Sequence, residues 1–118
     1  IIEKIKSEGL EVFVAINPET ELNRLDEIIH AVDGIVIMSV VPGFGGQEML
    51  PESIGRVKAL HAKYPELVIG VDGGVNKANI QSVFEAGASI VYIGTGLLKA
   101  DNPQEEWQAL NELAQNAG

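Results

Sequence analysis

Short apolar runs alternate with segments of helical periodicity along the chain, and this alternation limits the possible folds more than any other feature. Four runs of strand length lie at residues 12–16, 35–40, 67–71 and 90–93, and each ends in a turn rich in Gly, Pro, Asn or Asp. Strands that are apolar on nearly every residue are typical of a parallel sheet covered by helices. We therefore predict an α/β fold built from successive parallel β/α units.

The segments between the runs carry helix signals. Apolar residues recur there at helical spacing, and the predicted capping or starting residues are Thr20, Pro51, Asn76 or Asn79, and Asn102. We expect Trp107 to anchor the last helix in the core. Ile1, Ile2 and Ile5 form an apolar stripe that predicts one more helix at the start of the chain, ending at Gly9.

The length of 118 residues restricts the architecture. A complete eight-stranded β/α barrel takes at least about 200 residues, so four β/α units fit either a small open sheet or half of a barrel. No linker or low-complexity segment divides the sequence, and we predict one partial domain over residues 1–118. Because the chain starts inside a predicted helix and without Met, we expect a fragment of a longer protein.

Charge and composition exclude several classes of partner. The formal net charge of −9 argues against nucleic acid and anionic membranes, and no apolar run reaches the roughly 18 residues of a membrane span. There is no signal-peptide pattern and no cysteine, so we expect a cytoplasmic protein without disulfides or thiolate metal sites. A phosphorylated substrate stays possible, because backbone N–H groups at glycine turns bind phosphate without Lys or Arg.

Glycine-rich loops follow the last three predicted strands. In parallel α/β folds the ligand site lies at the carboxyl ends of the strands, so these loops are expected to meet. Any one of them is equally well a plain flexible turn, but three on adjacent strands indicate an anion site. Their candidate phosphate-binding residues are Gly43, Phe44, Gly45 and Gly46 in the first loop, Gly73 and Gly74 in the second, and Gly94 and Thr95 in the third.

Two side chains near these loops are candidates for chemistry. Asp72 ends the third run, so its carboxylate is expected at the mouth of the sheet, although Asp-Gly pairs also serve as simple turns. Met38 lies on the second run, where a methionine is more often core filler. His30 and His61 fall on predicted helices and are interpreted as surface residues, not metal ligands.

With these residues in place, the sequence resembles the ribulose-phosphate 3-epimerase family. The resemblance rests chiefly on residues 38–47 (MSVVPGFGGQ), supported by residues 15–18 (AINP), 71–76 (VDGGVN) and 94–95 (GT). It matches strands five to eight of that family, which implies the C-terminal half of a TIM (β/α)8 barrel.

The resemblance also implies an activity and roles for residues. The family interconverts ribulose 5-phosphate and xylulose 5-phosphate by two-base proton transfer through an enediolate that a divalent metal ion (Zn, Fe, Mn or Co) stabilises. Asp72 matches an aspartate that is both acid/base and metal ligand, Met38 matches a residue lining the enediolate pocket, and the glycine loops match the phosphate site. The second aspartate, two metal-binding histidines and a serine belong to early strands outside this chain, so metal is expected only with that half present.

Departures from the family pattern keep alternatives open. Val41 replaces a residue that is usually polar, and residues 96–98 (GLL) replace the usual small-Ile-Phe. The alternatives are an epimerase of another ketose phosphate, another isomerase or phosphate-dependent lyase, and a phosphate-binding half-barrel without activity. A half-barrel would leave strands 12–16 and 90–93 as open edges and Val36, Met38 and Val40 without cover, so we expect a homo-oligomer.

Overall fold

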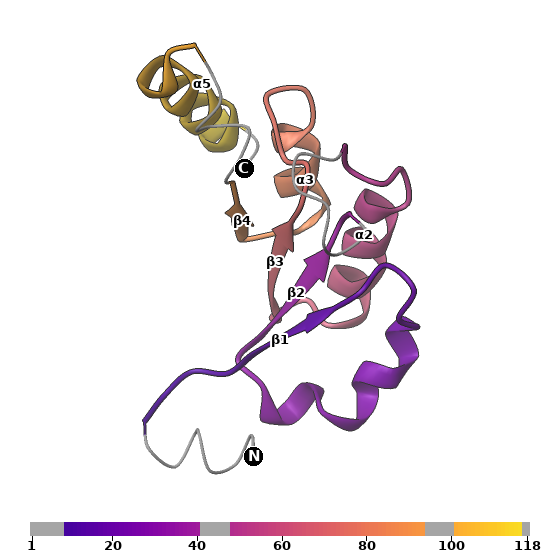
Figure 1. Cartoon of the computed structure of the whole chain (residues 1–118). Coiled ribbons are helices and arrows are strands. Elements are labelled where there is room, and N and C mark those ends of the chain that lie inside the picture. The colour runs from indigo at the N-terminus through magenta and orange to yellow at the C-terminus, as the bar shows by residue number, and fades with distance from the viewer. Residues whose placement is uncertain (1–8, 41–47, 94–100, 117–118) are drawn as a thin grey trace.

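A four-stranded parallel sheet forms the centre of the molecule (Figure 1). The computed structural model describes residues 9–40, 48–93 and 101–116. The strands are β1 (Phe13–Ile16), β2 (Gly34–Met38), β3 (Val68–Asp72) and β4 (Ile90–Tyr92), in the order β1-β2-β3-β4, and each neighbouring pair is parallel. The predicted succession of parallel β/α units is confirmed.

Helices connect the strands and cover one face of the sheet. Two short 3-10 helices, η1 (Leu22–Glu27) and η2 (Ile29–Ala31), follow β1; α2 (Ser53–Lys63) follows β2; α3 (Ile80–Ala86) follows β3; and α5 (Pro103–Asn116) follows β4. Both α2 and α3 lie on the same side of the sheet (Figure 1). None of the helices in the described ranges is long and apolar enough to cross a membrane.

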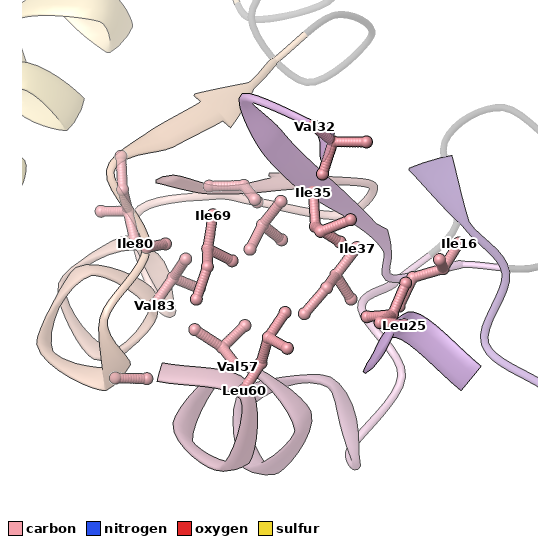
Figure 2. Close-up of a cluster of buried hydrophobic side chains, with 14 of the residues drawn as sticks. Ile16, Leu25, Val32, Ile35, Ile37, Val57, Leu60, Ile69, Ile80 and Val83 are labelled. Carbon is pink, nitrogen blue, oxygen red and sulfur yellow. The ribbon is translucent and has the colours of Figure 1, made fainter. Parts of the chain in front are cut away.

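The two faces of the sheet differ sharply in burial. Ile35, Ile37 and Ile69 are fully buried on the helix side, where Val57 and Leu60 of α2 pack against them (Figure 2). Side chains alternate between faces along a strand, so the residues between these belong to the opposite face. On that face Val36, Met38 and Asp72 are only partly buried. The lack of cover over Val36 and Met38 stays a prediction, because both side chains are partly buried. Strands β1 and β4 are the outer strands of the described sheet, as expected.

The helix starts follow the predicted positions closely in three of four cases. Pro51 lies two residues before α2, and Asn79 directly precedes α3. The side-chain oxygen of Asn102 accepts a hydrogen bond from the Glu105 backbone N–H at 3.3 Å, which confirms it as the cap of α5. Gly9 has a positive φ of 81°, but the helix predicted before it lies outside the described residues.

The segment after β1 differs from the predicted α-helix. The backbone N–H of Arg24 bonds to the carbonyl of Glu21 at 3.2 Å, three residues back, and Thr20 makes no cap. The carbonyl of Thr20, which an α-helix would use as an acceptor, receives a hydrogen bond from Nη2 of Arg56 at 2.6 Å instead. A guanidinium from α2 thus competes with the local helix and leaves 3-10 turns.

The predicted role of Trp107 is also wrong. Its side chain is 53% exposed, whereas Leu110, one turn later, is 2% exposed and is the core anchor of α5. Helix α5 packs on α3 through the face that carries Leu110. Leu110 of α5 and Ile80 and Phe84 of α3 line the same cleft of about 310 Å³. Trp107 is among the residues that line that cleft.

Candidate functional site

Asp72 and Met38 lie side by side at the carboxyl end of the sheet. They are paired in the β2–β3 register, and Tyr92 of β4 is the next residue in the same row. Residues paired in a parallel sheet point to the same face, so all three belong to the face opposite the helices. The sheet therefore presents one carboxylate with an apolar thioether on one side and a phenol ring on the other.

A glycine turn follows Asp72 immediately. Gly73 and Gly74 have positive φ values of 126° and 72°, a region that side-chain-bearing residues rarely adopt. A Cβ atom at Gly74 would lie 2.3 Å from the backbone nitrogen of Met49, so the backbone after β3 packs directly against the segment that leads into α2. Only glycine permits this approach, and it brings the loops after β2 and β3 together.

Ser39 joins the same two loops by hydrogen bonds. Its backbone N–H donates to the carbonyl of Asp72 at 2.8 Å, and its hydroxyl donates to the carbonyl of Gly73. Its own carbonyl accepts from the N–H of Leu50 at 2.8 Å, and the side chain is fully buried. Ser39 therefore fixes the peptide that carries the Asp72 carboxylate. The sequence analysis missed this role, although a lone hydroxyl at the end of an apolar run was a usable signal.

Two further side chains hold the loops at this end of the sheet. The Asn79 amide donates to the carbonyl of Gly74 at 2.9 Å and accepts from the N–H of Asn76 at 2.9 Å, which closes the β3–α3 loop on itself. Arg56 reaches from α2 to the loop after β1, where it donates to the carbonyls of Asn17, at 3.1 Å, and of Pro18. Neither role was predicted from the sequence.

Metal-ligating side chains do not gather in the part of the chain that is described. No group of three His, Cys, Asp or Glu residues there could hold an ion, and Asp72 is the single carboxylate in its row of the sheet. His30 lies in η2 and His61 in α2, both exposed, which agrees with their predicted helical positions.

Much of the predicted phosphate site lies outside the described residues. This applies to Gly43, Phe44, Gly45 and Gly46 after β2, to Gly94 and Thr95 after β4, and to the unusual residue Val41. These loops follow β2 and β4, which both neighbour β3 in the parallel sheet. The last described residues before the loops therefore lie at the same end of the sheet as Asp72.

A larger cleft lies at the opposite end of the strands. It has a volume of about 560 Å³ and is lined by residues that precede β2 and β3, among them Val32, Asp33 and Leu67, together with Lys63 and Tyr64 at the end of α2. Ligand sites of parallel α/β sheets occupy the carboxyl ends of the strands, and this cleft is at the amino ends. We therefore place the candidate site at Asp72.

An ion pair beside this cleft links η1 to the end of α2. Lys63 Nζ lies 2.7 Å from Asp26 Oδ1, and the Tyr64 hydroxyl donates to the same carboxylate. These hydrogen bonds, first from Lys63 and then from Tyr64, hold the pKa of Asp26 below its ordinary value of 3.8. The pKa values of Lys63 and Tyr64 are raised, chiefly by their hydrogen bonds to Asp26.

Solved structures agree with the barrel interpretation. The chain superposes on 3-hexulose-6-phosphate synthase from Salmonella typhimurium with a TM-score of 0.79 and 18% identity, covering 99% of this chain and 55% of that one. A BexX/CysO complex of Amycolatopsis orientalis gives a TM-score of 0.78 at 20% identity, covering 98% of this chain and 46% of that one. At these identities the likeness shows the fold alone, a half of a TIM-type barrel.

Sequence comparison is more specific. A ribulose-phosphate 3-epimerase of Candida glabrata is 37% identical over 105 residues, which are 89% of this chain and 43% of that protein. The cytoplasmic isoform of Oryza sativa subsp. japonica is 34% identical over 120 residues, covering 99% of this chain and 53% of its own length. The chain thus spans about half the length of these relatives. The sequence profile of the ribulose-phosphate 3 epimerase family matches residues 1–98, and the chain belongs to that family.

Proposed function

We propose that this chain, one partial domain over residues 1–118, supplies the phosphate-binding half and one acid/base group of a ribulose-phosphate 3-epimerase. The single observation that carries the proposal is the placement of Asp72. Its carboxylate ends β3 on the face opposite the helices, beside Met38 and directly before the Gly73-Gly74 turn. The substrate would be ribulose 5-phosphate or xylulose 5-phosphate, which differ in configuration at the carbon next to the ketone.

The proposed step is a proton transfer at that carbon. Asp72 takes the proton from C3, the electron pair of the broken C–H bond moves toward the ketone oxygen, and an enediolate forms. Return of a proton to the opposite face of C3 gives the epimer, which requires a second acid outside the described residues. Met38 contributes an apolar wall next to Asp72, which keeps water away from the enediolate.

Phosphate binding in this proposal rests on backbone groups. The N–H groups of the glycine loops, Gly73 and Gly74 among them, would face the phosphate, and glycine is needed where the backbone must approach a ligand closely. This is compatible with the net charge of −9, because no cationic cluster is required. Val substitution at Gly45 or Gly73 is accordingly expected to weaken binding more than neutralisation of Lys58, Lys77 or Lys99.

The described residues do not by themselves fit a divalent metal ion, since they offer Asp72 without a cluster of further ligands. An ion such as Zn, Fe, Mn or Co is therefore proposed only for an assembled barrel in which Asp72 is one of several ligands. We further propose a small sugar phosphate as substrate, no nucleic-acid or membrane partner, a homo-oligomer, and a cytoplasmic location.

Deuterium exchange tests the role of Asp72. The chain is incubated with ribulose 5-phosphate in D2O, and loss of the C3 proton signal is followed by NMR. Because general-base catalysis contributes about a hundred- to ten-thousand-fold, Asp72→Asn is expected to slow the exchange by a factor in that range while phosphate binding persists. Glu66→Gln, an exposed acid before β3, is the matched control and should exchange at the parent rate.

The same assay addresses the open alternatives. Exchange that is undiminished in Asp72→Asn would contradict the acid/base role. Faster exchange on a ketohexose phosphate than on ribulose 5-phosphate would instead favour an epimerase of another ketose phosphate. Inorganic phosphate binding without any exchange would indicate a phosphate-binding half-barrel that lacks activity.

A further inference from the structure

Two consecutive peptide carbonyls in the turn after Asp72 are each held by a different side chain. The hydroxyl of Ser39, in the segment after β2, donates to the carbonyl of Gly73. The side-chain amide of Asn79, directly before α3, donates to the carbonyl of Gly74 at 2.9 Å. Two separate elements of the fold therefore fix the two peptides that follow the candidate acid/base residue.

A fixed carbonyl also fixes the N–H group of the same peptide. The peptide unit is planar, and no cis bond occurs in the described residues, so its C=O and N–H groups point in opposite directions. The N–H of Gly74 therefore points away from Ser39, and the N–H of Val75 points away from the Asn79 side chain. Ser39 and Asn79 thus determine the direction of two successive N–H donors without bonding to either.

Neither of these donors is used within the described protein. In residues 9–40, 48–93 and 101–116, no backbone or side-chain acceptor takes the N–H of Gly74 or of Val75. Gly74 is partly buried and Val75 is buried. Because buried N–H groups are nearly always paired, the two donors call for an acceptor that the described residues do not supply. Successive N–H groups in a turn form concave sites that bind anions.

Packing keeps both side chains in place against the turn. A Cβ atom at Gly73 would lie 3.0 Å from Oγ of Ser39 and 2.7 Å from Cγ2 of Val40, so the turn lies directly on the segment after β2. The Asn79 side chain also accepts a hydrogen bond from the N–H of Asn76 at 2.9 Å, so both ends of its amide are engaged. Neither side chain can rotate away without losing a contact of its own.

We infer that Ser39 and Asn79 are positioning residues for a bound anion, and that each acts on a different donor. Ser39 sets the N–H of Gly74 through the Gly73 carbonyl, and Asn79 sets the N–H of Val75 through the Gly74 carbonyl. The identity of the anion, the phosphate of a sugar phosphate, rests on the proposed function. The assignment of one side chain to each donor rests on the hydrogen bonds alone.

Amide NMR with inorganic phosphate tests the two roles separately. In the parent chain, phosphate is expected to shift the amide signals of both Gly74 and Val75. Asn79→Asp keeps an acceptor for the Asn76 N–H but loses the donor to Gly74, so it should reduce the shift of Val75 more than that of Gly74. Ser39→Ala should show the reverse preference, and Ser39→Thr, which keeps the hydroxyl, should restore the parent pattern. Asn79→Asp and Ser39→Ala should each raise the phosphate Kd about tenfold, as expected for one lost hydrogen bond to a charged group.

Asn76→Asp is the matched control, because it adds the same charge to the same loop. The Asn76 side-chain oxygen accepts from the N–H of Ala78 at 2.8 Å, and an aspartate keeps that acceptor without affecting the Gly74 carbonyl. At physiological ionic strength, where salt screens the added charge, its phosphate Kd should stay within about twofold of the parent value.

Several results would overturn the inference. They are a parent chain in which phosphate shifts neither amide, equal phosphate Kd values for parent and Asn79→Asp, an equal loss in Asn76→Asp, and variants that reduce both shifts in the same proportion. C3 exchange separates this inference from the proposed chemistry. Shifts that follow the expected pattern while exchange is undiminished in Asp72→Asn would refute only the chemistry. Exchange that depends on Asp72, with phosphate binding insensitive to Asn79→Asp, would refute only the positioning roles.

Discussion

Single residues at the carboxyl end of the sheet decide where the Asp72 carboxylate lies. Ser39 bonds to the peptides of Asp72 and Gly73 from the neighbouring strand end, and Gly74 allows Met49 to pack against the same loop. A donor that is fully buried and an approach that excludes a Cβ atom each tolerate little change. The position of the carboxylate thus depends on residues that carry no chemistry of their own.

Two glycines with opposite environments give a paired prediction. Gly74→Ala is expected to lower the free energy of unfolding. Strained backbone at a φ of 72° costs roughly 1–3 kcal/mol by itself, and the clash of the new Cβ atom with Met49 adds to that cost. Gly55→Ala, at an exposed position of α2 with nothing within 4 Å, should instead raise the free energy of unfolding by about 0.5–1 kcal/mol. Urea unfolding measures both; equal effects would contradict the close approach at Gly74.

Ser39→Ala removes the donor that the Gly73 carbonyl uses. An unsatisfied buried group costs about 1–3 kcal/mol, so the free energy of unfolding is expected to fall by that amount. Ser82→Ala, at an exposed position of α3, is the control and should change it by less than about 0.5 kcal/mol. Matching urea midpoints for the two variants would show that the Ser39 hydroxyl holds nothing in place.

At the level of elements, side chains from α2 determine the conformation after β1. Arg56 takes carbonyls of the loop that follows β1, and Lys63 and Tyr64 hold Asp26 of η1. The segment between β1 and β2 is therefore anchored by α2 at its start and again in η1, near its middle. This anchoring explains how a stretch of short 3-10 helices keeps a fixed position without the regular hydrogen bonds of an α-helix.

The Asp26 contacts should depend on pH. Because the pKa of Asp26 is lowered in the folded state, its contribution to stability is present above 3.8 and is lost as pH falls through the folded value. The pKa values of Lys63 and Tyr64 are raised, so their contribution is present below 10.5 and 10.0 and is lost as pH rises through the folded values.

The stability difference between the parent and Asp26→Asn is therefore expected to be small but measurable at neutral pH and to vanish in acid and in strong base. Urea midpoints across pH measure it. Glu19→Gln, an exposed acid in the turn after β1, serves as the comparison and should show no such window. A difference between parent and Asp26→Asn that stays constant with pH would assign the effect to packing.

In the described residues, the whole molecule is a sheet with one face covered by helices, one face that is only partly buried, and β1 and β4 as its outer strands. Its apolar edges favour association, while the net charge of −9 on each copy opposes it. At physiological ionic strength, salt largely screens the repulsion between surface charges that lie more than about 8 Å apart. Added salt should therefore strengthen association. If copies of the chain associate, as the sequence analysis expects, the balance between apolar contact and charge predicts a stability that depends on concentration.

The thermal midpoint of the parent chain is accordingly expected to rise with protein concentration and with salt, because association stabilises the folded state by mass action. Scanning calorimetry over a hundredfold concentration range measures this. Tyr92→Ser, which removes apolar surface from the β4 edge, should reduce the concentration dependence. A midpoint independent of concentration would show that the edges do not associate.

Local sequence pattern determined a large part of this structure. The four strands lie within two residues of their predicted positions, and Asp72 ends a strand at the expected mouth of the sheet. The family could also be identified, since its motif is continuous over residues 38–47. These features depend on neighbours close in sequence, such as side-chain alternation, turn residues and contiguous motifs, so the sequence carries them directly.

Contacts between distant segments decided the rest. Ser39 and Gly73 are 34 positions apart, and Arg56 reaches carbonyls 36 to 39 positions away. Thr20 lost its predicted capping role to such a contact, and Trp107 lost its core position because α5 docks through Leu110. A hydrogen-bonding side chain takes whichever partner the packed chain brings within reach. That partner is fixed by how the helices lie on the sheet, and local periodicity contains no record of it.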